Sequence, residues 1–131
     1  MEIVVTENAV RDIAELPGEV EDTFFSAKKT AEKNLNLGAS PDQALEKYLS
    51  GGMHPILQET LGADYRAWFI EGGRANKMLG RNEFDEDKLY CFRVLTAKEA
   101  HKIEDGSRNA RAILQFENHR FSSLRNCYAV S

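Results

Sequence analysis

The sequence contains few cysteines and prolines, with 2 and 3 of these residues among 131. Cys91 and Cys127 form no Cys-x-x-Cys pair and are too few for the disulfide framework of a small secreted domain. We therefore expect reduced thiols, which behave as small apolar core residues, and a cytoplasmic protein. The histidines His54, His101 and His119 lack the spacing of a zinc site. No nucleotide-binding motif is present either, so we expect no cofactor, and we expect His54 to be a surface group.

Long hydrophobic runs are also missing. No apolar run approaches the ~18–20 residues that a membrane span requires, and the N-terminal segment turns acidic at once instead of opening with positive charge. We therefore expect neither contact with a membrane nor a secretory signal. Apolar residues still make up 42% of the chain, which is too much for a disordered protein. The length is that of one domain, so we expect a single domain over residues 1–131.

The net charge of −4 hides an uneven distribution. Residues 1–64 carry a net charge of −7, whereas residues 65–131 carry +3. An acidic protein is a poor non-specific ligand for nucleic acid, but its basic half can form a local surface that faces phosphate groups. The alternative is a chance partition of a mixed surface.

The spacing of apolar residues predicts a strand, three helices, two strands and a helical tail. A break between two helices is marked by Leu16-Pro17-Gly18. Helix starts are indicated by Ser40-Pro41 and by Thr96 with Glu99. We expect loops at 53–61 and 73–88, the second of them solvated. The expected strands cover 3–5, 65–70 and 89–95, and the expected helical segments cover 7–16, 19–37, 40–50, a turn from 96, and 110–114.

This order predicts an α+β fold with a small twisted antiparallel sheet and an N-terminal helical hairpin on one face. The strand at 89–95 is apolar apart from Arg93, as is typical of a central strand. We expect the first strand to lie at an edge of the sheet or beside the strand that begins at Tyr65.

One group of basic side chains stands out in the second half of the chain. If the strands at 65–70 and 89–95 pair, Arg66 and Arg93 lie on adjacent strands, and the register decides whether they share a face. Guanidinium and ammonium groups neutralise charge that grows on phosphate oxygens, and an imidazole can move protons near neutral pH. The alternative is that Arg93 pairs with a carboxylate and that the neighbouring lysines are solvated. The cations and the imidazole that follow the second strand are Lys98, His101 and Lys102.

Three stretches together resemble RelE/ParE-type toxins. The segments IVVTENA and DIAELPGEV, at 3–9 and 12–20, resemble the family's opening strand, its helix closing on a Leu-Pro step, and the second helix of a hairpin. The segment DYRAWFI at 64–70 resembles its "YR" strand. Residues 89–98 resemble the last central strand and basic turn, and the run to Ala110 resembles the C-terminal helical segment of the phage-derived, HigB-like branch.

The resemblance implies a toxin of a toxin–antitoxin system that cleaves mRNA without a metal. An RNA 2′-hydroxyl would attack the adjacent phosphate, while Arg66 and Arg93 hold that phosphate. Lys98 is the better positional match to the family's basic turn, and His101 is the better proton carrier near neutral pH. The partners would be a cognate antitoxin protein and mRNA or the ribosome. Further RNA contacts are expected from Tyr65, Lys102 and Arg108.

The chain also departs from the family pattern. The segment 40–50 and the loop 73–88 look like insertions, the tail 117–131 has no counterpart, and ribosome-dependent members are typically basic. The alternative function is a non-catalytic protein-binding module, or a toxin with a target other than RNA, on the same fold. We expect the tail to dock on the chain's first helices or on a second copy, which would give a homodimer. The apolar contacts for docking or binding would be Phe121, Leu124 and Tyr128.

Overall fold

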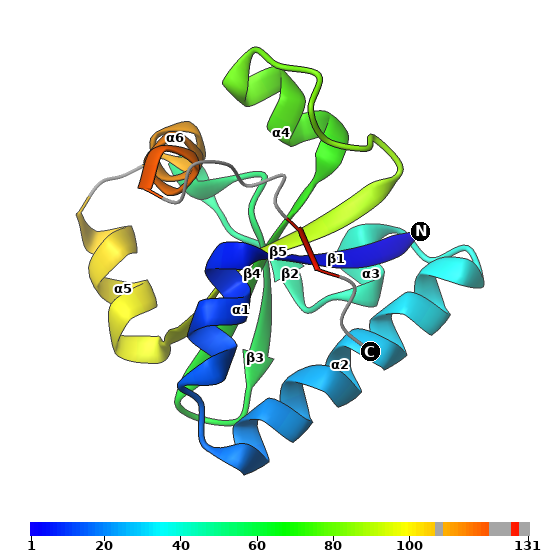
Figure 1. Cartoon of the computed structure of the whole chain (residues 1–131), viewed down its shortest axis with the longest axis vertical. Coiled ribbons are helices and arrows are strands. Elements are labelled where there is room, and N and C mark those ends of the chain that lie inside the picture. The colour runs from blue at the N-terminus through cyan, green and yellow to red at the C-terminus, as the bar shows by residue number, and fades with distance from the viewer. Residues whose placement is uncertain (107–108, 121–126, 129–131) are drawn as a thin grey trace.

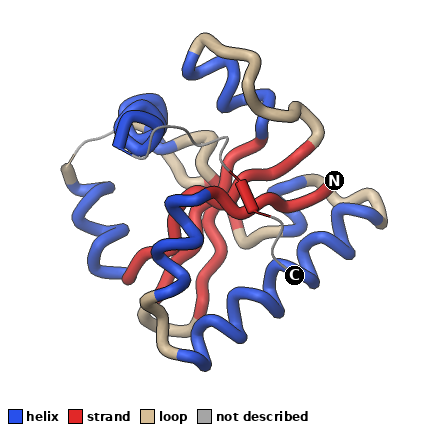
Figure 2. Tube along the Cα trace, viewed as in Figure 1, coloured by secondary structure: helices blue, strands red, loops and turns tan. Residues whose placement is uncertain are grey.

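A six-stranded sheet in the order β2-β3-β4-β5-β1-β6 forms the centre of the computed structural model, which describes residues 1–106, 109–120 and 127–128. Helices lie on both faces of the sheet (Figures 1 and 2). The strands are β1 (Glu2–Thr6), β2 (Lys47–Tyr48), β3 (Leu57–Leu61), β4 (Tyr65–Glu71), β5 (Lys88–Thr96) and β6 (Cys127–Tyr128). The helices are α1 (Glu7–Ala14), α2 (Gly18–Asn36), α3 (Pro41–Ala44), α4 (Gly72–Leu79), α5 (Ala97–Asp105) and α6 (Ala110–Arg120), with a 3₁₀ turn η1 (Gly51–Met53).

The strand pairing confirms the α+β class and corrects the prediction of an antiparallel sheet. Strands β2 to β5 pair antiparallel with their neighbours, but β1 runs parallel to β5 and antiparallel to β6. The sheet is therefore mixed. The first strand lies between β5 and β6, neither at an edge nor beside β4. A local sequence pattern could not show the position of β1, because its partners β5 and β6 come much later in the chain.

Two apolar layers cover the two faces. Ala9 and Ile13 of α1 and Phe24 of α2 pack with the sheet residues Val5 and Phe69 on one face. This confirms the predicted placement of the N-terminal helices. The other face is covered as well, by α4, α5 and α6. Its buried residues include Trp68, Phe92, Leu95, Ala100 and Leu114.

The N-terminal elements begin and end within two residues of the predicted positions. The Thr6 side chain accepts a hydrogen bond from the backbone N–H of Ala9 (3.4 Å) and caps α1. Pro17 separates α1 from α2, and α2 ends at Asn36, two residues before Gly38. Gly38 has a φ of +100°, a left-handed conformation that glycine adopts at low cost.

Two predicted segments differ from the structure. The helix expected over 40–50 ends at Ala44, because Lys47 and Tyr48 pair with β3, a strand in the expected loop 53–61. The expected loop 73–88 begins with α4. Asn76 of α4 closes it with two hydrogen bonds to the backbone of Phe84, at 2.8 and 2.9 Å. In both places, contacts between residues eight to eleven positions apart accompany the departure from the local preference.

The C-terminal elements follow the sequence more closely. The Thr96 hydroxyl accepts from the Glu99 N–H, and the Glu99 carboxylate accepts from the Thr96 N–H, both at 3.1 Å, so the predicted capping box opens α5. In the tail, Tyr128 of β6 pairs with Val5 of β1 in the same chain, so this part docks on its own sheet. Phe121 and Leu124 lie outside the described residues. No helix in the described part of the chain is long and apolar enough to cross a membrane.

Candidate functional site

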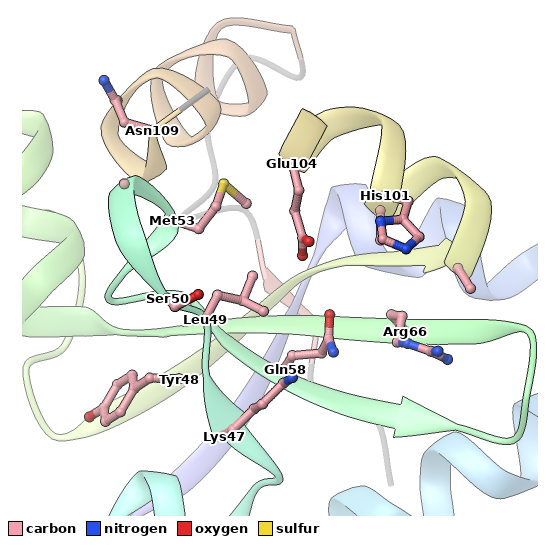
Figure 3. A pocket seen from close by; sticks show the side chains of 13 residues that line it. Lys47, Tyr48, Leu49, Ser50, Met53, Gln58, Arg66, His101, Glu104 and Asn109 are labelled. Atoms are coloured by element: carbon pink, nitrogen blue, oxygen red, sulfur yellow. The ribbon is translucent and has the colours of Figure 1, made fainter. Parts of the chain in front are cut away.

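A polar cavity of about 630 Å³ lies between the sheet, η1 and α5 (Figure 3). Strands β2, β3 and β4 form its floor, and one face of α5 borders it. Its charged side chains come from three separate elements, so the fold and not one motif creates it. The lining side chains with hydrogen-bonding or ionisable groups include Lys47, Gln58, Arg66, His101, Glu104 and Asn109.

Strand register places three donor groups on this floor. Lys47 of β2 lies opposite Gln58 of β3, and Gln58 lies opposite Trp68 of β4. Arg66 precedes Trp68 by two residues on β4, so both side chains point to the same face of the sheet. Figure 3 shows the side chains of Lys47, Gln58 and Arg66 along the floor.

Arg66 supplies a cation without a carboxylate partner in the described residues. Its Nη1 donates to the backbone oxygens of Tyr65 (2.8 Å) and Ala63 (3.3 Å). These two contacts hold the guanidinium near the β3–β4 turn and leave its charge uncompensated. The group can therefore bind an anion in the cavity.

Helix α5 brings an imidazole and a carboxylate to the same cavity. Ala97, Ala100, His101 and Glu104 line it, at positions that share one face of a helix. His101 is exposed and Glu104 is half-buried. Neither side chain has a hydrogen-bond or ion-pair partner within 1–106, 109–120 and 127–128, so both are available to a ligand.

The other residues predicted for the site lie elsewhere. Lys98 and Lys102 are exposed on α5 and do not line the cavity. The half-buried Tyr65 packs on the opposite face of the sheet, against the core beneath α1 and α2. Arg108 lies outside the described residues.

Arg93 occupies a separate ion-pair cluster between α1 and α6. Its Nε lies 2.8 Å from Oδ2 of Asp12, and its Nη1 lies 2.9 Å from Oε1 of Glu117. The N–H of Val94 also donates to Asp12 (2.9 Å). This is the arrangement that the sequence offered as the alternative for Arg93. A β-bulge leaves Phe92 opposite no β4 residue, so simple alternation could not locate the Arg93 side chain.

Two members of this ion-pair cluster have shifted pKa values. Burial raises the pKa of the Asp12 carboxyl, although the Arg93 guanidinium acts in the opposite direction. For Arg93, burial acts to lower the pKa, but the hydrogen bond and charge of Asp12, together with Glu117, outweigh it and raise that pKa. Arg93 therefore stays charged and stays paired.

Several lining residues escaped the sequence prediction, among them Lys47, Gln58 and Glu104. Lys47 fell in an expected helix and Gln58 in an expected loop, so neither could be placed on a sheet. Glu104 carried a usable signal, because it follows His101 by three residues on a helix that the sequence predicted.

A second polar cluster borders the cavity at Tyr48. The Tyr48 hydroxyl donates to Oε1 of Glu71 (2.6 Å), and the Arg74 guanidinium lies over the Tyr48 ring, 5.6 Å from its centroid. Burial, followed by the hydrogen bond to Glu71, raises the pKa of Tyr48 to about 12. The exposed His54 packs its ring 4.9 Å from that of Tyr48, which agrees with the predicted surface position.

A comparison with protein-family models, curated proteins and solved structures finds no match for this chain. No group of three or more His, Cys, Asp or Glu residues in the described ranges is arranged to hold a metal ion. The chemistry of the cavity must therefore be inferred from the side chains that line it.

Proposed function

We propose that the cavity between the sheet and α5 cleaves RNA without a metal, by attack of a 2′-hydroxyl on the adjacent phosphate. One observation carries this proposal: the unpaired guanidinium of Arg66 and the imidazole of His101 line the same open polar cavity. Phosphodiester cleavage requires an anion-binding group next to a proton carrier, and these two side chains are of those kinds.

Arg66 would hold the phosphate that is attacked. A guanidinium donates two parallel hydrogen bonds to phosphate oxygens, and it gains strength as negative charge grows on them in the transition state. The substrate must be RNA, because the 2′-hydroxyl is the attacking nucleophile. Lys98 and Lys102, exposed on α5, would attract the RNA backbone.

His101 and Glu104 would move the two protons. The Glu104 carboxylate accepts the proton of the 2′-hydroxyl as the oxygen–phosphorus bond forms. The His101 imidazolium donates a proton to the 5′-oxygen as its bond to phosphorus breaks. The products are a 2′,3′-cyclic phosphate and a 5′-hydroxyl. Glu104 takes the place that Lys98 held in the sequence prediction, because Lys98 does not line the cavity.

We further propose that the protein is a RelE/ParE-like toxin of a toxin–antitoxin system. The sequence resemblance and the α+β order of elements support this proposal. Its partners would be a cognate antitoxin and mRNA, free or on the ribosome, in the cytoplasm. Induced expression should then slow growth of the host, and Arg66→Ala should restore it. Equal growth of both strains would contradict the toxin proposal.

Cleavage of a mixed-sequence RNA in the presence of EDTA tests the catalytic proposal. The wild type should cleave free or translated RNA, and Arg66→Ala and His101→Asn should cleave it far more slowly. Arg81→Ala and His54→Asn are matched controls, since both residues are exposed and outside the cavity, and both should retain activity. If a control variant lost as much activity, cleavage would not depend on this cavity, and the proposal would be contradicted.

A second candidate function is a non-catalytic protein-binding module. Phe116 of α6 is 57% exposed and borders a hollow of about 190 Å³ that Ile103 and Ile113 also line. Exposed aromatic side chains beside an apolar hollow are typical of protein contacts. A wild type that leaves both free and translated RNA intact would favour this function.

A further inference from the structure

Gln58 is a buried side chain with an unused donor at the floor of the cavity. The residue is 7% exposed, and its Oε1 accepts a hydrogen bond from Nε1 of Trp68 (3.1 Å). Its Nε2 has no hydrogen-bond partner among the described residues. Nε2 is not among the buried side-chain atoms that lack a partner in the described residues. It is therefore open to the cavity that Gln58 lines, where it can donate to a ligand.

The partner of Gln58 determines which atom faces the cavity. An indole N–H can only donate, so the oxygen of the Gln58 amide must face Trp68. Trp68 is fully buried and packs against Phe92 with ring centroids 6.4 Å apart, which prevents the indole from moving. The NH₂ group of Gln58 is therefore held in one orientation and can meet only an acceptor.

The surroundings of this NH₂ group favour an anionic acceptor. Gln58 is the register partner of Lys47, and Arg66 lies two residues before Trp68 on the next strand. Neither cation forms an ion pair in the part of the chain that the structure describes. Glu104, from α5, is the carboxylate among the lining residues, so positive charge exceeds negative charge around the amide.

We propose that Gln58 donates from Nε2 to a phosphate oxygen and completes, with Lys47 and Arg66, a phosphate-binding floor. Trp68 is a positioning residue that acts through Gln58. This inference rests on the proposed function for the nature of the substrate. It adds two residues to the site, Lys47 and Gln58, and identifies the ligand of the floor as a phosphodiester.

The test uses a probe that can bind but cannot react. A deoxydinucleotide with one phosphodiester has no 2′-hydroxyl, so its binding is independent of cleavage. In a ¹H–¹⁵N NMR titration of the wild type, the Gln58 side-chain NH₂ pair should shift with the probe. The indole signal of the chain's single tryptophan should shift with the same affinity. Inorganic phosphate should produce weaker shifts of the same NH₂ pair.

Gln58→Glu removes the donor and keeps the shape. A carboxylate oxygen can still accept from Trp68, so an unchanged indole signal shows that the local structure is retained. Affinity for the deoxydinucleotide should fall at least about tenfold, since a hydrogen bond to a charged group is lost and an anion replaces it. Gln115→Glu is the matched control: the charge change is the same, on an exposed α6 residue outside the cavity. The control should bind as the wild type does.

The outcomes separate this inference from the proposed function. Binding by the wild type that is lost in Gln58→Glu supports the phosphate floor even if RNA stays uncleaved. Equal binding of the deoxydinucleotide by wild type and Gln58→Glu overturns the inference, even if RNA is cleaved. If Gln58→Glu does not fold, the wild-type titration decides, because NH₂ signals of Gln58 that do not respond to the probe also overturn it.

Discussion

Arg93 of β5 and Glu117 of α6 form an ion pair of 2.9 Å in which the two side chains are 14% and 4% exposed. Glu117 also accepts a hydrogen bond from Nδ2 of Asn8 in α1 (2.9 Å). One carboxylate therefore joins the C-terminal helix to a strand and to the first helix. The Oδ1 atom of Asn8 is buried without a hydrogen-bond partner in the described part of the chain, so this junction already contains one unpaired buried acceptor.

Glu117→Ala should destabilise the fold strongly. The change leaves the Arg93 guanidinium with Asp12 alone and removes an acceptor of Asn8, and the loss of one member of a buried ion pair costs about 3 kcal/mol or more. Urea denaturation should show this fall in the free energy of unfolding. Glu86→Ala, at an exposed position, should change it by less than ~0.5 kcal/mol. A similar small change in Glu117→Ala would mean that α6 does not depend on this junction.

The two strand arginines should give opposite phenotypes. Within the described residues Arg66 bonds only to backbone oxygens, so Arg66→Ala should reduce RNA cleavage by roughly 10²–10³-fold and change stability little. Arg93→Met leaves the carboxylates of Asp12 and Glu117 without their cation, so it should lower the free energy of unfolding by about 3 kcal/mol or more. At a temperature where it remains folded, Arg93→Met should cleave at close to the wild-type rate. A catalytic Arg93 would instead abolish cleavage in a protein that is still folded.

Tyr48 should ionise with a pKa of about 12 in the folded protein. In the unfolded chain it loses its proton near its ordinary pKa of 10.0. The unfolded state therefore binds fewer protons between these values, and stability falls as pH rises from about 10 to about 12. Ultraviolet titration of tyrosinate in wild type and Tyr48→Phe should isolate this transition. Burial and then the hydrogen bond to Glu71 raise this pKa. Glu71→Gln should therefore move the transition to lower pH, and an unchanged transition would show that Glu71 does not contribute to the shift.

Two adjacent glycines at the start of α4 should differ sharply in their tolerance of alanine. A Cβ at Gly72 would lie 1.9 Å from the backbone oxygen of Asp85, whereas a Cβ at Gly73 would meet nothing closer than 3.7 Å. Gly72→Ala should therefore cost about 1–3 kcal/mol or more through overpacking. Gly73→Ala should be neutral or stabilise the helix by up to ~1 kcal/mol. Equal melting temperatures for the two variants would contradict the close approach of α4 to the 83–87 segment.

The sequence predicted the elements whose signals are local. Pro17, the capping pair Thr96 and Glu99, and the apolar spacing of α2 each act within a few residues, and each marks an element that the structure contains. The strands β2 and β3 were not predicted, because they are defined by their pairing with each other and, for β3, with β4. The position of β1 beside β5 depends on contacts between residues that are far apart in the sequence, such as Glu2 and Lys88, and no local pattern encodes them.

The site was predictable to the extent that it depends on one helix or one strand. The sequence identified Arg66 as an anion-binding group and His101 as a proton carrier, and the structure brings both to one cavity. Arg93 could not be placed, because the bulge at Phe92 interrupts the alternation of β5. Gln58 could not be found, because its significance depends on the Trp68 indole across the strand pair.

The chemistry of the RNA ends tests the central proposal most directly. RNA incubated with the protein in EDTA would be analysed by mass spectrometry, beside the same RNA carrying 2′-O-methyl groups. Attack by the 2′-hydroxyl predicts fragments that end in a 2′,3′-cyclic phosphate and begin with a 5′-hydroxyl, and it predicts that methylated RNA stays intact. Fragments with 3′-hydroxyl and 5′-phosphate ends, or cleavage of the methylated RNA, would contradict the account.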